Sequence, residues 1–155
     1  MDAYLILKTV HVLSATVLFG TGLGIAYFFL MGLRSGDVAG AYFAARTTAI
    51  ADMLFTLTAG IVQPLSGIAL IHVAGYDPWA PWLAWTYALY LLALACWLPV
   101  VRLQLKMRDM LRAKLAGEAI DETVLRRRFR WWFALGWPAF VGLVAVFWLM
   151  VAKPG

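Results

Sequence analysis

Four long apolar runs divide the chain, and short polar segments separate each run from the next. The runs cover approximately residues 3–33, 48–74, 82–102 and 131–152. A helix needs about 20 mostly apolar residues to cross a hydrocarbon core of about 30 Å, and each run has that length. A membrane β-barrel would instead show short segments in which apolar and polar residues alternate. The pattern therefore predicts an all-α integral membrane protein, a four-helix bundle that forms a single domain over residues 1–155.

Residues that end and begin helices occupy the segments between the runs. Gly36 and Asp37 follow the first run, and the side chain of Asp37 is suited to cap the next helix. We expect that second helix to start at the membrane surface over residues 38–46 before it enters the bilayer. Gly117 and Asp121 form a second stop and start, between the third and fourth runs. The third and fourth helices are thus expected to extend beyond the membrane as a cytoplasmic helical hairpin.

The composition supports a membrane protein and predicts its orientation. Hydrophobic residues make up 64% of the chain, charged residues make up 14%, and the mean hydropathy is +0.82, which is outside the range of soluble domains. The segment from Arg102 to Arg130 holds nine Lys or Arg residues and four acidic ones, and Arg34 and Arg46 flank the first polar segment. By the positive-inside rule both segments face the cytoplasm. We therefore expect a bacterial inner (plasma) membrane protein whose N- and C-termini face outward.

The charge distribution and the small residues of the first helix also indicate which partners the protein could contact. The Arg102–Arg130 segment would attract anionic lipids of the bilayer by about 1 kcal/mol per basic residue near the surface. Nucleic acid is not expected, because no soluble basic face with reading elements is present. A ridge of small residues on the first helix, Thr16, Gly20 and Gly24, could contact another helix, a second copy or a partner membrane protein. The single cysteine, Cys96, excludes an intramolecular disulfide and a cysteine metal cluster within this chain.

Ionisable residues inside the apolar runs are the first candidates for chemistry. Lys8 and His11 are three residues apart and share a helical face, and His72 lies near the same side of the membrane on the second helix. Two histidines on neighbouring helices could be axial ligands of a b-type haem, or His11 could bind copper. Lys8 could then contact a propionate. Alternatively, His11 is a polar contact between helices, His72 is an interfacial residue and Lys8 reaches for lipid headgroups.

Small and polar residues also line one face of the second helix. They are Asp52, Thr56, Gly60, Gln63 and Gly67. A lipid-facing stripe would be apolar, so this face is expected to turn into the bundle as a polar seam. Asp52 would then need a cation, and Arg102 at the end of the third run is the first candidate, with Arg130 as the second. Pro64 cannot donate a backbone hydrogen bond, so it leaves one carbonyl in need of another partner, and such turns sometimes line cavities.

The opening segment from Tyr4 to Ala15, followed by Gly20-Thr21-Gly22, resembles the start of a bacterial family of predicted integral membrane proteins of unassigned function. The resemblance extends over essentially the whole chain. The K-x-x-H pattern and the small residues after it are more distantly similar to the first helix of HemJ-type protoporphyrinogen oxidases and of copper-resistance protein D-like membrane domains. The similarity to the oxidases implies handling of haem or porphyrin, with His11 as the matching histidine.

Three functions remain open on this sequence. The first is binding of haem b or porphyrin, with or without a redox activity. The second is a non-enzymatic structural or assembly subunit, and the third is a small transporter or metal-uptake component. Whether the protein is an enzyme is left open, because the chain contains no Walker loop, HExxH or CxxC motif and no plausible Ser-His-Asp set.

Overall fold

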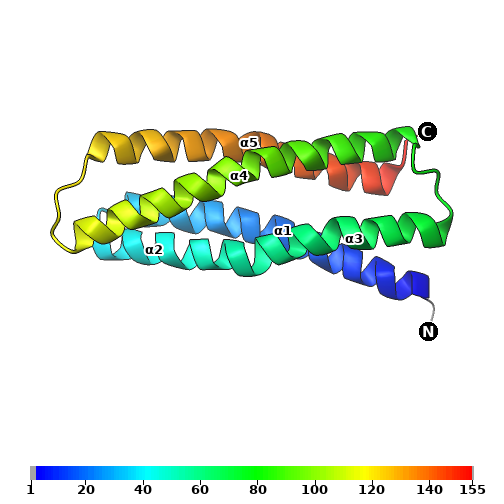
Figure 1. The fold of residues 1–155 in the computed structure, drawn as a ribbon, viewed down its shortest axis with the longest axis horizontal. Helices are drawn as coiled ribbons and strands as arrows, with labels where there is room; N and C mark the ends of the chain where they lie inside the picture. Colours follow the sequence, from blue (N-terminus) through cyan, green and yellow to red (C-terminus); the bar gives the residue numbers. More distant parts are fainter. Residues whose placement is uncertain (1–2, 155) are drawn as a thin grey trace.

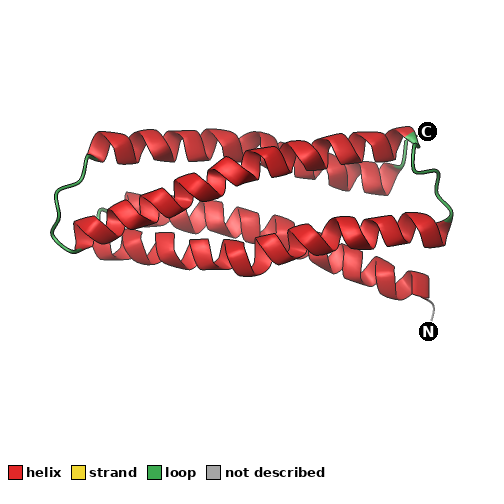
Figure 2. Cartoon of the chain, in the orientation of Figure 1, coloured by secondary structure: helices red, strands yellow, loops and turns green. Residues whose placement is uncertain are grey.

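The computed structural model describes residues 3–154, and these form four long helices joined by short turns (Figure 1, Figure 2). The elements in chain order are α1 (Ala3–Arg34), α2 (Val38–Ala51), the π-helical segment η1 (Asp52–Thr56), α3 (Leu57–Ala74), α4 (Pro81–Leu115) and α5 (Glu122–Ala152). The segments α2, η1 and α3 form one continuous helix. All four long helices have the length and composition to cross a membrane. The predicted all-α membrane bundle is confirmed.

Both helix starts that the sequence indicated are capped by aspartates. Asp37 accepts hydrogen bonds from the backbone N–H groups of Ala39 (3.1 Å) and Gly40 (2.8 Å). Asp121 accepts from Val124 (3.2 Å) and Thr123 (2.8 Å), and these two donors hold the pKa of the Asp121 carboxyl below its usual value. As predicted, residues 38–46 open the second helix, and the backbone continues from α2 into η1 without a break.

The bundle has two different ends (Figure 1). At one end lie the turns over residues 35–37 and 116–121, and we call it the basic end because the arginine-rich start of α5 lies there. At the other, the terminal end, lie both chain termini and the connection over residues 75–80. Which end faces the cytoplasm stays a prediction.

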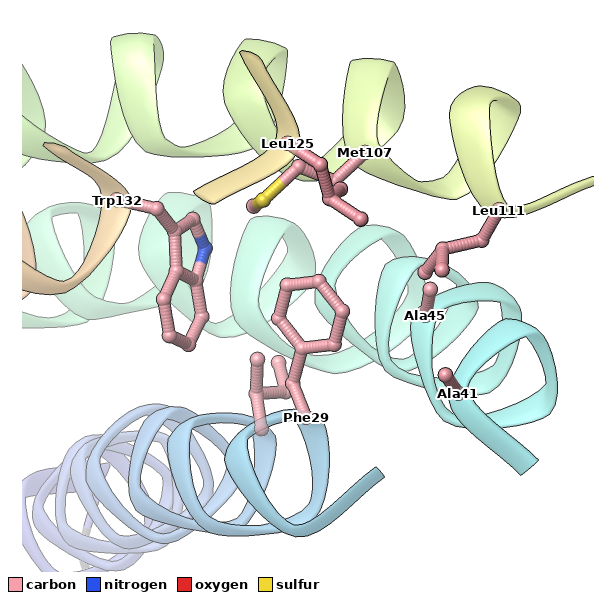
Figure 3. Close-up of a cluster of buried hydrophobic side chains, with 8 residues drawn as sticks. Phe29, Ala41, Ala45, Met107, Leu111, Leu125 and Trp132 are labelled. Atoms are coloured by element: carbon pink, nitrogen blue, oxygen red, sulfur yellow. The ribbon is translucent and has the colours of Figure 1, made fainter. Parts of the chain in front are cut away.

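The basic end holds the main hydrophobic core (Figure 3). Its buried members come from α1, α2, α4 and α5: Ile25, Phe29, Ala41, Ala45, Met107, Leu111, Leu125 and Trp132. The ring of Phe29 is fully buried and meets Trp132 edge-on, with the ring centroids 5.1 Å apart. The α4–α5 hairpin therefore does not project alone, because the ends of α1 and α2 pack along it.

Toward the terminal end the helices separate into two pairs. There α1 packs mainly on α3, and α4 packs mainly on α5, whereas α1 and α5 have few contacts. Phe19 of α1 links the pairs by stacking on Phe140 of α5, with centroids 5.0 Å apart. A smaller cluster of Trp82, Leu83 and Leu149 closes the far end of the α4–α5 pair. This separation leaves room between the pairs in the middle of the bundle.

Candidate functional site

A cavity of about 580 Å³ lies between the two helix pairs. Its walls are almost entirely apolar side chains contributed by α1, α3, α4 and α5. The side chains in the wall with hydrogen-bonding groups are few: Asp52, Thr56, Tyr90, Trp97, Gln104, Trp132 and Trp137. The volume is within the range of about 300–1,000 Å³ that is typical of small-molecule sites, and so is an apolar wall with a few polar groups.

The π-helical segment supplies two of these polar groups. Asp52 begins η1 and Thr56 ends it, and the two side chains are 3% and 9% exposed. The wider turn is closed by a hydrogen bond from the N–H of Leu57 to the carbonyl of Asp52. The three residues between Asp52 and Thr56 are exposed. Single π-turns inserted in α-helices are frequent at functional sites, and here the turn places one carboxyl and one hydroxyl in the cavity wall.

Two tryptophans of the α4–α5 pair donate hydrogen bonds to polar side chains of the cavity wall. The indole Nε1 of Trp97 donates to Oδ1 of Asp52 at 3.1 Å. The indole Nε1 of Trp132 donates to Oε1 of Gln104 at 3.2 Å. Among the described residues, Nε2 of Gln104 and Oγ1 of Thr56 are buried and have no hydrogen-bond partner. An unpaired buried polar group costs about 1–3 kcal/mol, so these two groups are unusual for a well-packed structure.

Arg102 does not pair with Asp52, and the predicted ion pair is wrong. The salt bridges in residues 3–154 join Arg108 to Asp109 at 2.6 Å and Lys114 to Glu122. Arg102 and Arg130 are both exposed. The reason is the rotation of α4: a helix turns about 100° per residue, so the inward position of Gln104 directs Arg102 to the opposite side.

Pro64 leaves the carbonyl of Gly60 without its usual helical donor, as the sequence indicated. The hydroxyl of Tyr90 on α4 donates to this carbonyl. An ideal Cβ on Gly60 would lie 3.8 Å from that hydroxyl oxygen, an ordinary contact distance, so the approach of Tyr90 does not depend on the glycine. Gly60, Pro64 and Tyr90 all line the cavity. The proline therefore creates a directed contact between the two helix pairs where apolar packing is sparse.

His11 lies outside the cavity wall, in a polar contact between α1 and α3. Its Nδ1 lies 2.9 Å from Oγ of Ser66, and its Nε2 lies 3.1 Å from Nε2 of Gln63. An amide nitrogen only donates, so Nε2 of His11 accepts and Nδ1 carries the proton that is donated to Ser66. Ser14 donates to the amide oxygen of Gln63. An ideal Cβ on Gly67 would lie 3.2 Å from the imidazole, so this glycine makes room for the ring.

The structure does not bring the other two predicted ligands to His11. Lys8 is exposed, with its Nζ 5.7 Å from the ring centroid of Tyr4, and His72 is exposed on α3. No group of three or more His, Cys, Asp or Glu in residues 3–154 could hold a metal ion. Both imidazole nitrogens of His11 are already engaged, so this residue does not fit an axial ligand of haem.

Sequence reasoning found Asp52, Thr56 and Gln63 but missed Trp97, Gln104 and Tyr90 on α4. One signal for Gln104 was present: it lies seven residues after Trp97 and three before Met107, on one helical face that is otherwise apolar. The ridge of Gly20 and Gly24 is not used within the chain, because a Cβ on either residue would meet nothing within 4 Å.

Comparison with known proteins identifies a family and no more. No curated protein and no solved structure matches this chain. The more distant similarity to HemJ-type oxidases and copper-resistance protein D-like domains therefore stays a prediction. One family model matches residues 5–154, nearly the whole chain, and its description is "Predicted integral membrane protein". On that match, the chain belongs to the family of predicted integral membrane proteins known as DUF2269.

Proposed function

We propose that this protein binds a small amphipathic molecule inside the membrane. The apolar body of the ligand occupies the cavity between the helix pairs, and its polar head contacts Asp52, Thr56 and Gln104. One observation carries the proposal: Gln104, which is 1% exposed, lies in the wall of an apolar cavity of about 580 Å³, and its Nε2 has no hydrogen-bond partner among the described residues. A ligand head offers the missing hydrogen bond.

Binding of haem b or porphyrin stays a prediction, and the geometry gives it little support. The described residues that line the cavity include no His, Cys, Met or Lys, so an iron atom there would lack its usual protein ligands apart from a tyrosine. Tyr90, that tyrosine, donates to Gly60. The propionates of a haem would also meet Asp52 rather than a cation. The roles of assembly subunit and of small transporter likewise stay predictions.

The test of binding uses two glycines of α1 as a matched pair. Gly22 lines the cavity and Gly20 does not, and an added Cβ at either position would meet nothing within 4 Å. Gly22→Leu therefore fills cavity space without a backbone clash, whereas Gly20→Leu adds the same side chain elsewhere. The full chain is purified in mild detergent, and mass spectrometry identifies the small molecules released from it.

We expect an amphipathic molecule that is retained by the wild type and by Gly20→Leu and lost from Gly22→Leu. Equal retention by all three proteins contradicts the proposal. The visible spectrum of the same preparations, from cells supplied with a haem precursor, tests the haem alternative. A Soret band that His11→Ala abolishes would favour haem bound through His11.

The orientation and lipid contacts are part of the proposal. The basic end would lie at the cytoplasmic surface of a bacterial inner membrane, where the run from Arg126 to Arg130 contacts anionic headgroups. A reporter enzyme fused to the C-terminus tests this placement. Activity of a reporter that works only in the cytoplasm would overturn it.

A further inference from the structure

This inference rests on the proposed binding function and names the class of ligand. We infer that the cavity takes an isoprenoid quinone or its quinol, a flat ring with uncharged oxygen groups on a long apolar tail. The inference concerns binding alone. It follows from which hydrogen-bonding groups are free at the polar part of the wall, from the charge there, and from the shape and opening of the cavity.

The free amide nitrogen of Gln104 requires an acceptor. Because Oε1 of Gln104 accepts from Trp132, the orientation of the amide is set and its two N–H donors remain. The hydroxyl of Thr56 adds a group that donates or accepts. A quinone carbonyl or a quinol oxygen accepts from both. An alkylammonium head has no acceptor and would leave the amide of Gln104 unpaired.

The absence of a cation from the wall disfavours acidic heads. Asp52 is the only Asp, Glu, Lys, Arg or His among the described residues of the wall, and neither of the salt bridges in residues 3–154 involves it. A fatty-acid carboxylate or a phosphate would therefore bring a negative charge into a buried site that holds a carboxyl group and no cation. A quinol can instead donate its O–H to the carboxyl oxygen of Asp52 that Trp97 does not contact.

The rest of the wall matches a flat ring and a long tail. Aromatic side chains are frequent in it: Phe19, Trp97, Trp132, Phe133, Trp137 and Phe140. Ile61 and Leu65 of α3 and Leu94 of α4 also line the cavity, yet they are 54%, 63% and 42% exposed. The cavity thus opens to the side of the bundle, which is the lipid side in a membrane. A tail longer than the cavity continues there into the bilayer.

The test measures quenching of tryptophan fluorescence by decylubiquinone, a quinone with a ten-carbon tail, in the full-length protein reconstituted in lipid nanodiscs. We expect a saturable component that Gly20→Leu keeps and Gly22→Leu loses. Gln104→Leu and Thr56→Val should each weaken this component, by about tenfold for Gln104→Leu, because one hydrogen bond to the head is lost. Thermal unfolding of both variants is measured in parallel, so that a loss of binding is distinguished from a loss of the fold.

Competition by three molecules with similar tails separates the ligand classes. Decylbenzene lacks the oxygen groups, decyltrimethylammonium carries a positive charge and decanoate carries a negative one. We expect each to displace the quinone at least tenfold less well than the corresponding quinol does. Equal competition by any of them, or unchanged quinone affinity in both Gln104→Leu and Thr56→Val, overturns the quinone class but leaves the binding function standing. Absence of any component sensitive to Gly22→Leu, together with equal retention of small molecules by the glycine variants, overturns the binding function itself.

Discussion

The basic end of the bundle and the cavity beside it are built from the same four helices but are held together in different ways. At the basic end, Phe29, Met107 and Trp132 form a buried cluster, and small residues such as Ala41 and Ala45 let the helices approach closely (Figure 3). Around the cavity, single hydrogen bonds such as Tyr90 to Gly60 link the pairs. In lipid, where apolar surfaces gain little from leaving the solvent, close packing and hydrogen bonds are the available sources of helix association.

The difference indicates that the basic end and the cavity region have different roles. The closely packed end keeps the two helix pairs together, so the rest of the bundle does not need a continuous interface. The polar groups of η1 and α4 lie next to this core, where their positions are well determined, and the cavity extends from them toward the terminal end. Four substitutions test this comparison.

The strongest test removes a ring from the basic end. Phe29→Ala should lower the free energy of unfolding by about 3 kcal/mol, because the side chain is fully buried and its loss leaves a cavity. Thermal unfolding in detergent measures the effect. The neighbouring Phe28 is 64% exposed, so Phe28→Ala is the matched control and should change stability little. Equal losses in the two variants would show that the basic end is not the main core.

His11→Ala tests whether α1 and α3 are joined by polar contacts near the terminal end. The substitution removes the hydrogen bonds to Ser66 and Gln63, and we expect a loss of roughly 1–2 kcal/mol. His72 is exposed, so His72→Ala should leave the unfolding curve unchanged. If His11→Ala is as stable as the wild type, the imidazole is not a structural contact.

Tyr90→Phe tests the link between the two helix pairs at the cavity. The carbonyl of Gly60 would lose its donor, and stability should fall by about 1 kcal/mol. In a Pro64→Ala background the backbone N–H of residue 64 becomes available to that carbonyl, so the same substitution should cost less. A double-mutant cycle measures the difference. Identical costs in both backgrounds would contradict the role assigned to Pro64.

The smallest effect concerns the helix start at the basic end. The backbone N–H groups of Val124 and Thr123 lower the pKa of Asp121, so its ionised form stabilises the fold. That contribution is present above the pKa of the unfolded chain, about 3.9, and is lost as the pH falls through the lowered pKa of the folded state. Asp121→Asn keeps a capping oxygen but should lack this pH-dependent component in unfolding curves between pH 5 and 2. If Asp121→Asn and the wild type lose stability equally as the pH falls, the contribution assigned to the Asp121 carboxylate is contradicted.

The sequence predicted the parts of the fold that depend on local chemistry. The lengths of the apolar runs, the caps at Asp37 and Asp121, and the unpaired carbonyl before Pro64 each follow from residues close together in the chain. The candidate site was predicted only in part. Asp52 and Thr56 stand out as polar residues in an apolar run, but the pairing of Asp52 with Arg102 was wrong, and Trp97 occupies that place.

What the sequence determined by itself is therefore the all-α membrane class, the four helices and the family. The rotation of each helix about its axis was decided only by the tertiary structure, because a helix that is apolar on every side shows no periodicity that marks its inner face. That rotation directs Trp97 and Gln104 inward and Arg102 outward, and it turns His11 toward α3. The cavity exists only when the two helix pairs are packed against each other at one end.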